Sequence, residues 1–499
     1  MPRLGMSCQR ALQQRQAIPL GTRPRPAATD GRDRAFALDE LDCTMRALIF
    51  RNLAELRQNY WFWPSLLTAV AFALGLLLPF IDQALGPGWM QAVPFLRPTG
   101  VDGARAILTT LAGATLGVAG VAFSITIVAV NFASSNYGPR LIGNFMGDRV
   151  NQVVLGVLVS TFVYCITVLS TVHAQNQTFD GDAGAFVPQL SVLFALALTL
   201  VSVGALIGYI HHVPESINIM NLVARIGMKL RESILRTLDE EAAWRRENVT
   251  VDVSAWRKNP PDSGSTLRAD MAGYLQQIDI AGLAALADEA EGQIVIHRAP
   301  GDFMTVDEPL LTIHPEQDEA WMESLRAHVS LGSNRTEMQD VMFLSDQLVE
   351  VLIRALSPGV NDPNTAILCL DWLRAGLSAF ANREPWQPAD AEGRILYTRA
   401  TFETMLTRSF GDMRQHIAAD RSVTLHAIGV LTDLAIVAAT PSMLAAVTGE
   451  LDRLATAAAE RLPESVGRGE AERALALARS RIESRDRQPI GIGTAREPL

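Results

Sequence analysis

A long uncharged stretch, residues 104–132, constrains the fold of this chain most strongly. It reads ARAILTTLAGATLGVAGVAFSITIVAVNF and carries no charge after Arg105. As a helix it would extend over roughly 43 Å, which exceeds the ~30 Å hydrocarbon core of a bilayer. The stretch therefore predicts a membrane-spanning helix, and it makes the chain an integral membrane protein.

One face of this helix carries small or weakly polar side chains at spacings of three and four residues. Its members are Thr110, Ala114, Gly117, Val121, Ser124, Val128, Asn131 and Ser135. Glycines at 113, 117 and 120 permit close backbone approach, as helices associating in lipid require. Two interpretations stay open. In one, the face packs against neighbouring helices. In the other, it lines a water-filled path in an oligomer through Thr110, Ala114, Gly117, Ser124, Asn131 and Ser135. Both place this helix at the centre of the membrane domain.

Length and composition narrow the remaining possibilities. The chain has 499 residues, enough for two or three domains, and 48% of them are hydrophobic, concentrated before residue 212. A net charge of -10 argues against a nucleic-acid partner. Its four cysteines (Cys8, Cys43, Cys165, Cys369) show no CxxC or Cys/His spacing, so neither a disulfide framework nor a zinc site is indicated.

The hydropathy pattern predicts four spans in a membrane domain over residues 45–212. The spans are about 62–85, 104–132, 150–172 and 188–210. Tyr60, Trp61 and Trp63 are aromatic residues typical of a membrane interface. We expect no buried acid or base within a span, which disfavours transport through a charged relay. Residues 1–44 are rich in Arg and Pro and predict a disordered tail, with Met45 the better candidate for the translation start.

The basic residues set the expected orientation. If four spans alternate, one side receives Arg46, Arg51, Arg57, Arg140, Arg149, Arg225 and Lys229. The other side has only Arg97 and Arg105 near the spans. The positive-inside rule then places both termini in the cytoplasm.

The fourth predicted span ends at His211 and His212, followed by Pro214 and Glu215. Two imidazoles and a carboxylate within one turn are weak candidates for a metal site. The simpler interpretation is an amphipathic helix end at the membrane interface, and we expect no metal or cofactor. Residues 213–257 predict a connecting helix whose apolar stripe needs a partner.

Residues 267–314 form the one region with strand-like character. GYLQQIDI and GQIVIH predict short strands around a helix over 281–290, and HRAPGDFMTVDEPLLTI resembles the hairpin of barrel-sandwich carrier domains. No lysine lies between Gly273 and Ile313, so covalent carriage of biotin or lipoate is excluded. We expect a structural module that lies at a subunit interface.

Residues 315–499 predict a helical cytoplasmic domain. The expected helices are 317–331, 336–356, 363–381, 401–419, 423–439, 441–462 and 470–484. Between the second and third lies RALSPGVNDPNTA, residues 354–366. Its polar residues Ser357, Asn361, Asp362, Asn364 and Thr365 form either a capped turn, with Pro363 at the first helical position, or a small ligand pocket at a helix N-terminus.

Several stretches together resemble an uncharacterised family of bacterial predicted membrane proteins, a domain of unknown function. They are residues 118–156 (VAGVAFSITIVAVNFASSNYGPRLIGNFMGDRVNQVVLG), FVPQLSV, GYIHHVPESI and RALSPGVNDPNTA. The resemblance covers nearly everything after Met45. It implies four membrane helices, a cytoplasmic C-terminal domain and a multi-pass protein of the bacterial inner membrane. It brings no established activity, substrate or catalytic residue.

The sequence favours a non-enzymatic membrane protein, because it has no GxxxxGK[ST], HExxH, GxSxG or strand-linked GxGxxG motif. The leading hypothesis is a homo-oligomeric, channel-like pore that is lined by the second span and gated by the cytoplasmic domain, with a small ion as the permeant species. The alternative is a membrane-anchored sensor or scaffold whose cytoplasmic domain binds a ligand or partner. The expected fold is mainly α: four transmembrane helices, then a mostly helical cytoplasmic domain with a small barrel-sandwich-like β module.

Overall fold

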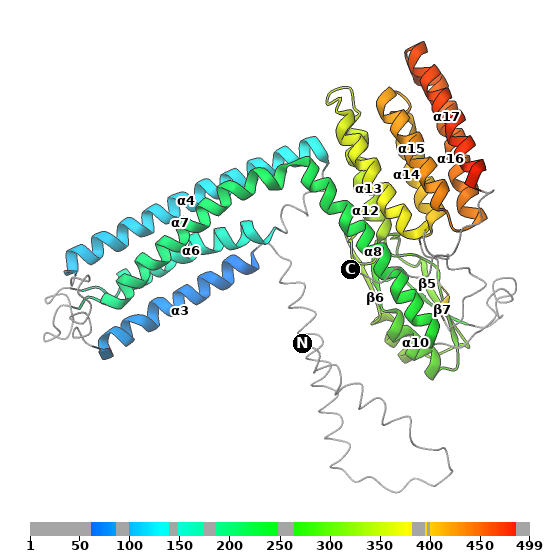
Figure 1. Cartoon of the computed structure of the whole chain (residues 1–499). Helices are drawn as coiled ribbons and strands as arrows, with labels where there is room; N and C mark the ends of the chain where they lie inside the picture. Colours follow the sequence, from blue (N-terminus) through cyan, green and yellow to red (C-terminus); the bar gives the residue numbers. More distant parts are fainter. Residues whose placement is uncertain are drawn as a thin grey trace, which may run out of the picture. The chain divides into compact units, whose positions relative to one another are not determined.

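The computed structural model describes residues 61–85, 99–138, 148–173, 186–247, 264–381, 395–396 and 400–485. The expectations for the tail 1–44, for residues 45–60 and for most of the linker after residue 247 lie outside these ranges. Four helices are long and apolar enough to cross a bilayer, as predicted. They are α3 (Phe62–Leu85), α4 (Val101–Tyr137), α6 (Arg149–Leu169) and α7 (Gln189–Ile217) (Figure 1).

The third span, α6, is the centre of the membrane bundle, and the prediction that the second span has this place is wrong. The most apolar window of α6 is 56% buried, against 22% in each of the other three helices. Helix α6 packs against both α4 and α7. It also meets α3 closely, because a Cβ at Gly75 would lie 2.9 Å from the Thr167 Cβ and one at Gly156 would lie 3.1 Å from the Pro64 Cα. The glycines that allow close approach are therefore those of α3 and α6.

Helix α4 turns a different face to the bundle from the one singled out in the sequence. Along the bundle its buried residues are Ala104, Leu108, Ala112, Thr115, Ala119, Ala122 and Thr126. These recur at intervals of three and four, so they form one stripe of mostly small side chains against α6 and α7. The packing seam exists, but on the opposite side of the helix.

Hydrogen bonds between spans tie the bundle together. The Thr161 and Ser202 hydroxyls lie 2.7 Å apart between α6 and α7. Tyr164 donates from α6 to the Ser191 carbonyl at 3.0 Å, and Tyr209 donates from α7 to the Ala122 carbonyl of α4 at 2.6 Å. In hydrocarbon these groups have no water to bond, so the pairing fixes how the helices face one another.

One carboxylate is buried within a span, contrary to expectation. Asp82, near the end of α3, accepts from the Leu190 amide at 2.8 Å, from the Ser191 amide at 2.9 Å and from the Ser191 hydroxyl at 2.7 Å. It thereby satisfies amides in the first turn of α7, which helix geometry leaves without intrahelical partners. Asp82 acts as a cap between helices.

Helix α8 (Ile219–Glu247) follows α7 almost directly, so the connecting helix begins later than residue 213. Pro214 lies inside α7, and the break falls at Asn218, whose side-chain oxygen accepts from the Met220 amide at 2.9 Å. The apolar stripe of α8 has its partner in the helical domain. Leu222, Val223, Ile226, Leu230 and Ile234 are buried there.

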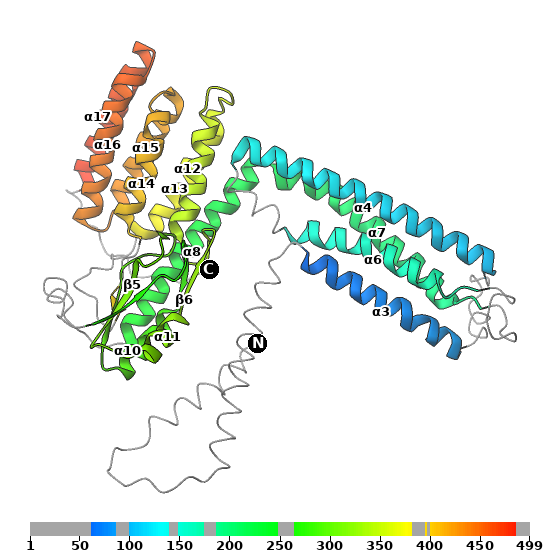
Figure 2. The ribbon, with the colours of Figure 1, turned by 180° about the vertical axis from the view of Figure 1, so that it is seen from behind.

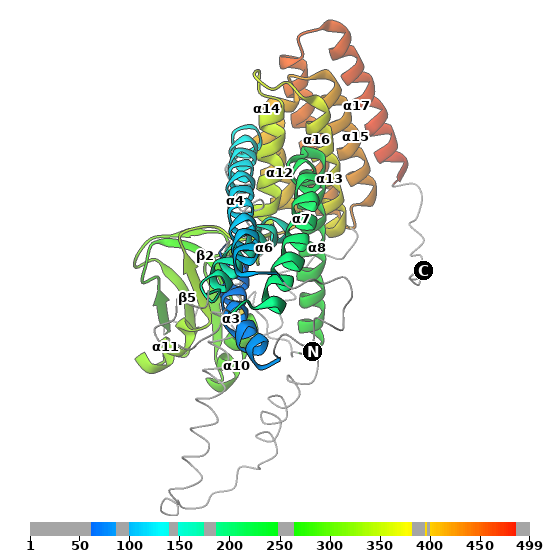
Figure 3. The same ribbon diagram turned by 90° about the vertical axis from the view of Figure 1, so that its left-hand side faces the viewer.

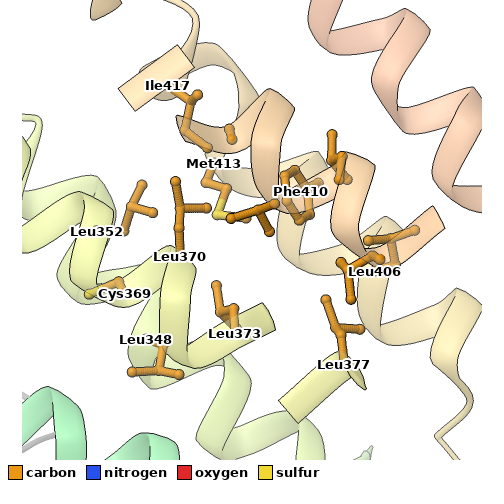
Figure 4. Packing of buried hydrophobic residues seen from close by; sticks show 14 of the residues in the cluster. Leu348, Leu352, Cys369, Leu370, Leu373, Leu377, Leu406, Phe410, Met413 and Ile417 are labelled. Atoms are coloured by element: carbon orange, nitrogen blue, oxygen red, sulfur yellow. The ribbon is translucent and has the colours of Figure 1, made fainter. Parts of the chain in front are cut away.

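The helical domain contains α12 (Val341–Ala355), α13 (Pro363–Ala381), α14 (Phe402–Ile417), α15 (Arg421–Val437), α16 (Pro441–Arg461) and α17 (Ser465–Arg485) (Figure 2). Their apolar faces meet in one core. Leu352 of α12, Leu370 and Leu373 of α13, and Phe410 and Met413 of α14 point toward one another there (Figure 4).

The β module holds two short sheets with helices α10 (Ile280–Glu289) and α11 (Glu319–Arg326) beside them (Figure 3). The strands are β1 (Ser265–Arg268), β2 (Gly273–Ile278), β3 (Gln293–Ile296), β4 (Phe303–Met304), β5 (Pro309–His314), β6 (Val329–Gly332) and β7 (Ile395–Leu396). They are ordered β1-β5-β3-β7 and β4-β2-β6. The predicted helix over 317–331 is wrong in its last part, because residues 329–332 pair with β2.

Candidate functional site

The side chains of the small and polar stripe of α4 are exposed in the part of the chain that the structure describes. Thr110, Ala114, Gly117, Ser124, Asn131 and Ser135 are all exposed. Val121 and Val128, which lie on the same face, are 61% and 67% exposed. The described part of one chain therefore places no second wall against these side chains.

The chemistry of the stripe is mild and uncharged. The Ser124 hydroxyl donates to the Gly120 carbonyl of the same helix at 2.9 Å, which leaves its oxygen lone pairs on the exposed face. A Cβ at Gly113, Gly117 or Gly120 would meet nothing within 4 Å. These glycines make no close approach to any other described part of the chain. Gly204 and Gly208 of α7 are equally open.

The far end of α4 reaches the core of the helical domain. Ala133 is fully buried in that core, and Val130 packs against it. The exposed stripe and the buried anchor point are thus parts of one 37-residue helix. A displacement at one end of a continuous helix is carried to the other end, because the hydrogen-bonded backbone is stiff along its axis.

The turn over residues 354–366 is built from its own hydrogen bonds. The Ser357 hydroxyl donates to the Arg354 carbonyl at 2.6 Å. Asp362 accepts from the Thr365 amide at 3.2 Å and from its hydroxyl at 2.6 Å, as an N-cap of α13 does. Asn361 has a positive φ of 50°, and Asn361 and Asn364 are exposed. Three of the five ligand candidates are thus occupied within the turn.

The His211, His212 and Glu215 side chains do not converge on one point. His211 lies 3.4 Å from Glu215 on an exposed surface, whereas His212 lies 2.6 Å from Asp148 at the start of α6. Within the described part of the chain, no group of three or more His, Cys, Asp or Glu side chains could hold a metal ion. Asp148 was missed from sequence, although an acid directly before a helix is a capping signal.

These observations define the class: an integral membrane protein with four apolar helices and a helical domain that carries a small β module. A family model described as "Predicted membrane protein (DUF2254)" matches residues 57–433. The match covers most of the chain, and the chain therefore belongs to this family.

Two mycobacterial relatives support the assignment. The protein named "Uncharacterized protein Rv1290c" of Mycobacterium tuberculosis is 28% identical over 436 residues, which cover 85% of this chain and 80% of that protein. The protein named "Uncharacterized protein Mb1321c" of Mycobacterium bovis matches with the same identity and coverage. No solved structure matches the chain.

Proposed function

We propose that this protein is a homo-oligomeric, channel-like membrane protein in which α4 of each copy lines a pathway for a small ion and the helical domain gates it. The protein would lie in the bacterial inner membrane with both termini in the cytoplasm. The observation that carries the proposal is that, among the residues the structure describes, nothing covers the side chains of the small and polar stripe of α4.

Lipid is a poor cover for this stripe. Thr110, Ser124 and Asn131 are exposed along one face of α4, and the first and last are about 32 Å apart along the helix axis. That distance is the full depth of the hydrocarbon core, where exposed polar side chains cost free energy. Water or a polar wall from other copies removes this cost.

The open glycines suit the contacts between copies. Gly113 and Gly120 flank the stripe on α4, and Gly204 and Gly208 are spaced four residues apart on α7. Glycines at such spacing let helix backbones approach closely in a membrane, where packing rather than the hydrophobic effect drives association. A ring of copies would bury the glycines at its seams and turn the stripe inward.

Flux measurements on Thr110→Leu and Ser124→Leu test the proposal. We expect wild-type protein in liposomes to dissipate an imposed ion gradient, which an entrapped indicator reports. Both variants should lose most of this ion flux. Leucine removes the hydroxyl and narrows the pathway. The protein in detergent should also have the mass of an oligomer.

Thr109→Leu is the matched control. Thr109 is exposed and adjacent to Thr110, yet it points about 100° around the helix and off the stripe. Flux that falls equally in Thr109→Leu would contradict an α4-lined pathway. So would wild-type vesicles as tight as protein-free ones, or a monomer in detergent.

A further inference from the structure

The turn after α12 fixes the backbone of Arg354. Both the amide and the hydroxyl of Ser357 donate to the Arg354 carbonyl, at 3.0 Å and 2.6 Å. On the other side of the turn, the Asp362 amide donates to the Ala355 carbonyl at 2.8 Å. The left-handed conformation of Asn361 lets the chain reverse between these bonds. The turn therefore holds the last residues of α12 in one position.

The Arg354 side chain reaches the end of α4. Its Nη1 donates to the Ser135 carbonyl at 3.2 Å. Ser135 lies in the last turn of α4, where carbonyls lack intrahelical donors and the helix dipole is negative. A guanidinium is the most favourable partner for such a carbonyl because its charge and its hydrogen bond act together.

Glu350, one helical turn before Arg354, contacts the residue that ends α4. Gly138 has a φ of 124°, and a Cβ at this position would clash with the Glu350 Oε1. Only glycine fits this backbone conformation and this contact without strain. The Glu350 carboxylate also lies 3.5 Å from Arg354 on α12. Arg354 and Glu350 of α12 therefore both contact the C-terminal end of α4.

We infer that the C-terminal end of α12, held in position by the turn that follows it, couples the end of α4 to the helical domain through the contacts of Arg354 with Ser135 and of Glu350 with Gly138. We call these four residues the α4 anchor. Arg354 is a positioning residue: it transmits the position of the helical domain to α4. The gating role of the anchor depends on the proposed function, whereas the anchoring itself does not.

Hydrogen exchange on the full-length protein in lipid nanodiscs tests the anchor directly. We expect Arg354→Gln to speed exchange of the amides at residues 133–138 roughly tenfold, since a hydrogen bond from a charged donor is lost. Gly138→Ala should do the same, because its Cβ displaces Glu350. Arg354→Lys keeps a charged donor and should restore slow exchange in part.

Two matched controls separate the anchor from general loss of stability. Arg374→Gln removes an arginine of similar exposure that pairs with Asp433 at 2.6 Å, away from α4. Gly359→Ala changes a glycine of the same turn whose Cβ would meet nothing within 4 Å. Both should leave exchange at 133–138 unchanged. Equal exchange in Arg354→Gln and Arg374→Gln would overturn the anchor.

Ion flux then tests the coupling. With wild-type protein that conducts, Arg354→Gln should change the flux while Arg374→Gln does not. Faster exchange with unchanged flux would overturn the coupling role. If wild-type protein does not conduct at all, the proposed function fails, and the exchange result still decides whether α4 is anchored.

Discussion

Replacing Glu450 with alanine is expected to lower the free energy of unfolding by about 3–5 kcal/mol, the cost of breaking a buried ion pair by removing one partner. Glu450 lies on α16 and is fully buried. Its carboxylate accepts from Arg414 of α14 at 2.6 and 2.9 Å and from Arg453 at 2.8 Å. Alanine would leave both guanidinium groups without this partner. Chemical denaturation of the full-length protein in detergent, followed by circular dichroism, measures the loss.

Asp452→Ala on the same helix is the control. Asp452 pairs with Arg479 at 2.8 Å, but both side chains are more than half exposed. Exposed pairs of this kind contribute only ~0–1 kcal/mol. A Glu450→Ala loss within that range would contradict the burial of the pair. Changing Glu450 to Leu together with Arg414 to Met should recover much of the stability, because the guanidinium then left without Glu450 is that of Arg453, which is about half exposed to water.

Replacing Asp82 with alanine is expected to destabilise the membrane bundle by about 2–4 kcal/mol, since hydrogen bonds to a charged acceptor are lost and buried donors stay unsatisfied. The Ser191 amide, the Ser191 hydroxyl and the Leu190 amide would all lose their acceptor. Asp82→Asn should fall between wild type and alanine, because an amide keeps one accepting oxygen. Thermal unfolding in detergent measures the stability of wild type, Asp82→Asn and Asp82→Ala, and so gives their order.

Asp102→Ala provides the comparison for Asp82. Asp102 is exposed in the first turn of α4, where an acid contributes only about 0.3–1 kcal/mol through the helix dipole. An Asp82→Ala protein as stable as Asp102→Ala would show that the cap between α3 and α7 does not hold in the membrane.

Hydropathy and capping chemistry explain what could be predicted. The four spans follow from long apolar runs, which no soluble helix needs. The helix starting at Pro363 follows from Asp362 directly before it, and the structure has the predicted bounds of 363–381. In both cases the residues that determine the helix lie within the helix itself or directly before it, so the prediction needs no knowledge of tertiary contacts.

The inner and outer faces of the spans could not be distinguished in this way. In a membrane both the lipid-facing and the helix-facing sides are apolar, so hydrophobic periodicity does not say which face is buried. The stripes of α4 centred on Gly117 and on Ala119 are alike in composition, yet among the described residues only the second is buried against other helices. The central place of α6 depends on its neighbours, and its own sequence does not reveal it.

Contacts between residues far apart in the sequence could not be predicted either. His212 finds Asp148, 64 residues earlier, and Arg354 finds Ser135, 219 residues earlier. The strand β7 has two residues and pairs in parallel with β3, a hundred residues away. Short elements and single contacts of this kind carry no local pattern, so only the tertiary fold reveals them.

The burial of α6 has a consequence for biosynthesis. Synthesis proceeds from α3 to α7, so α6 leaves the ribosome when α3 and α4 already exist but α7 does not. At that moment Thr161 lacks Ser202 and Tyr164 lacks the Ser191 carbonyl. In a nascent chain that stops after α6, the most buried helix of the bundle therefore lacks its contacts with α7. Translation of the fourth span supplies these contacts and completes the bundle.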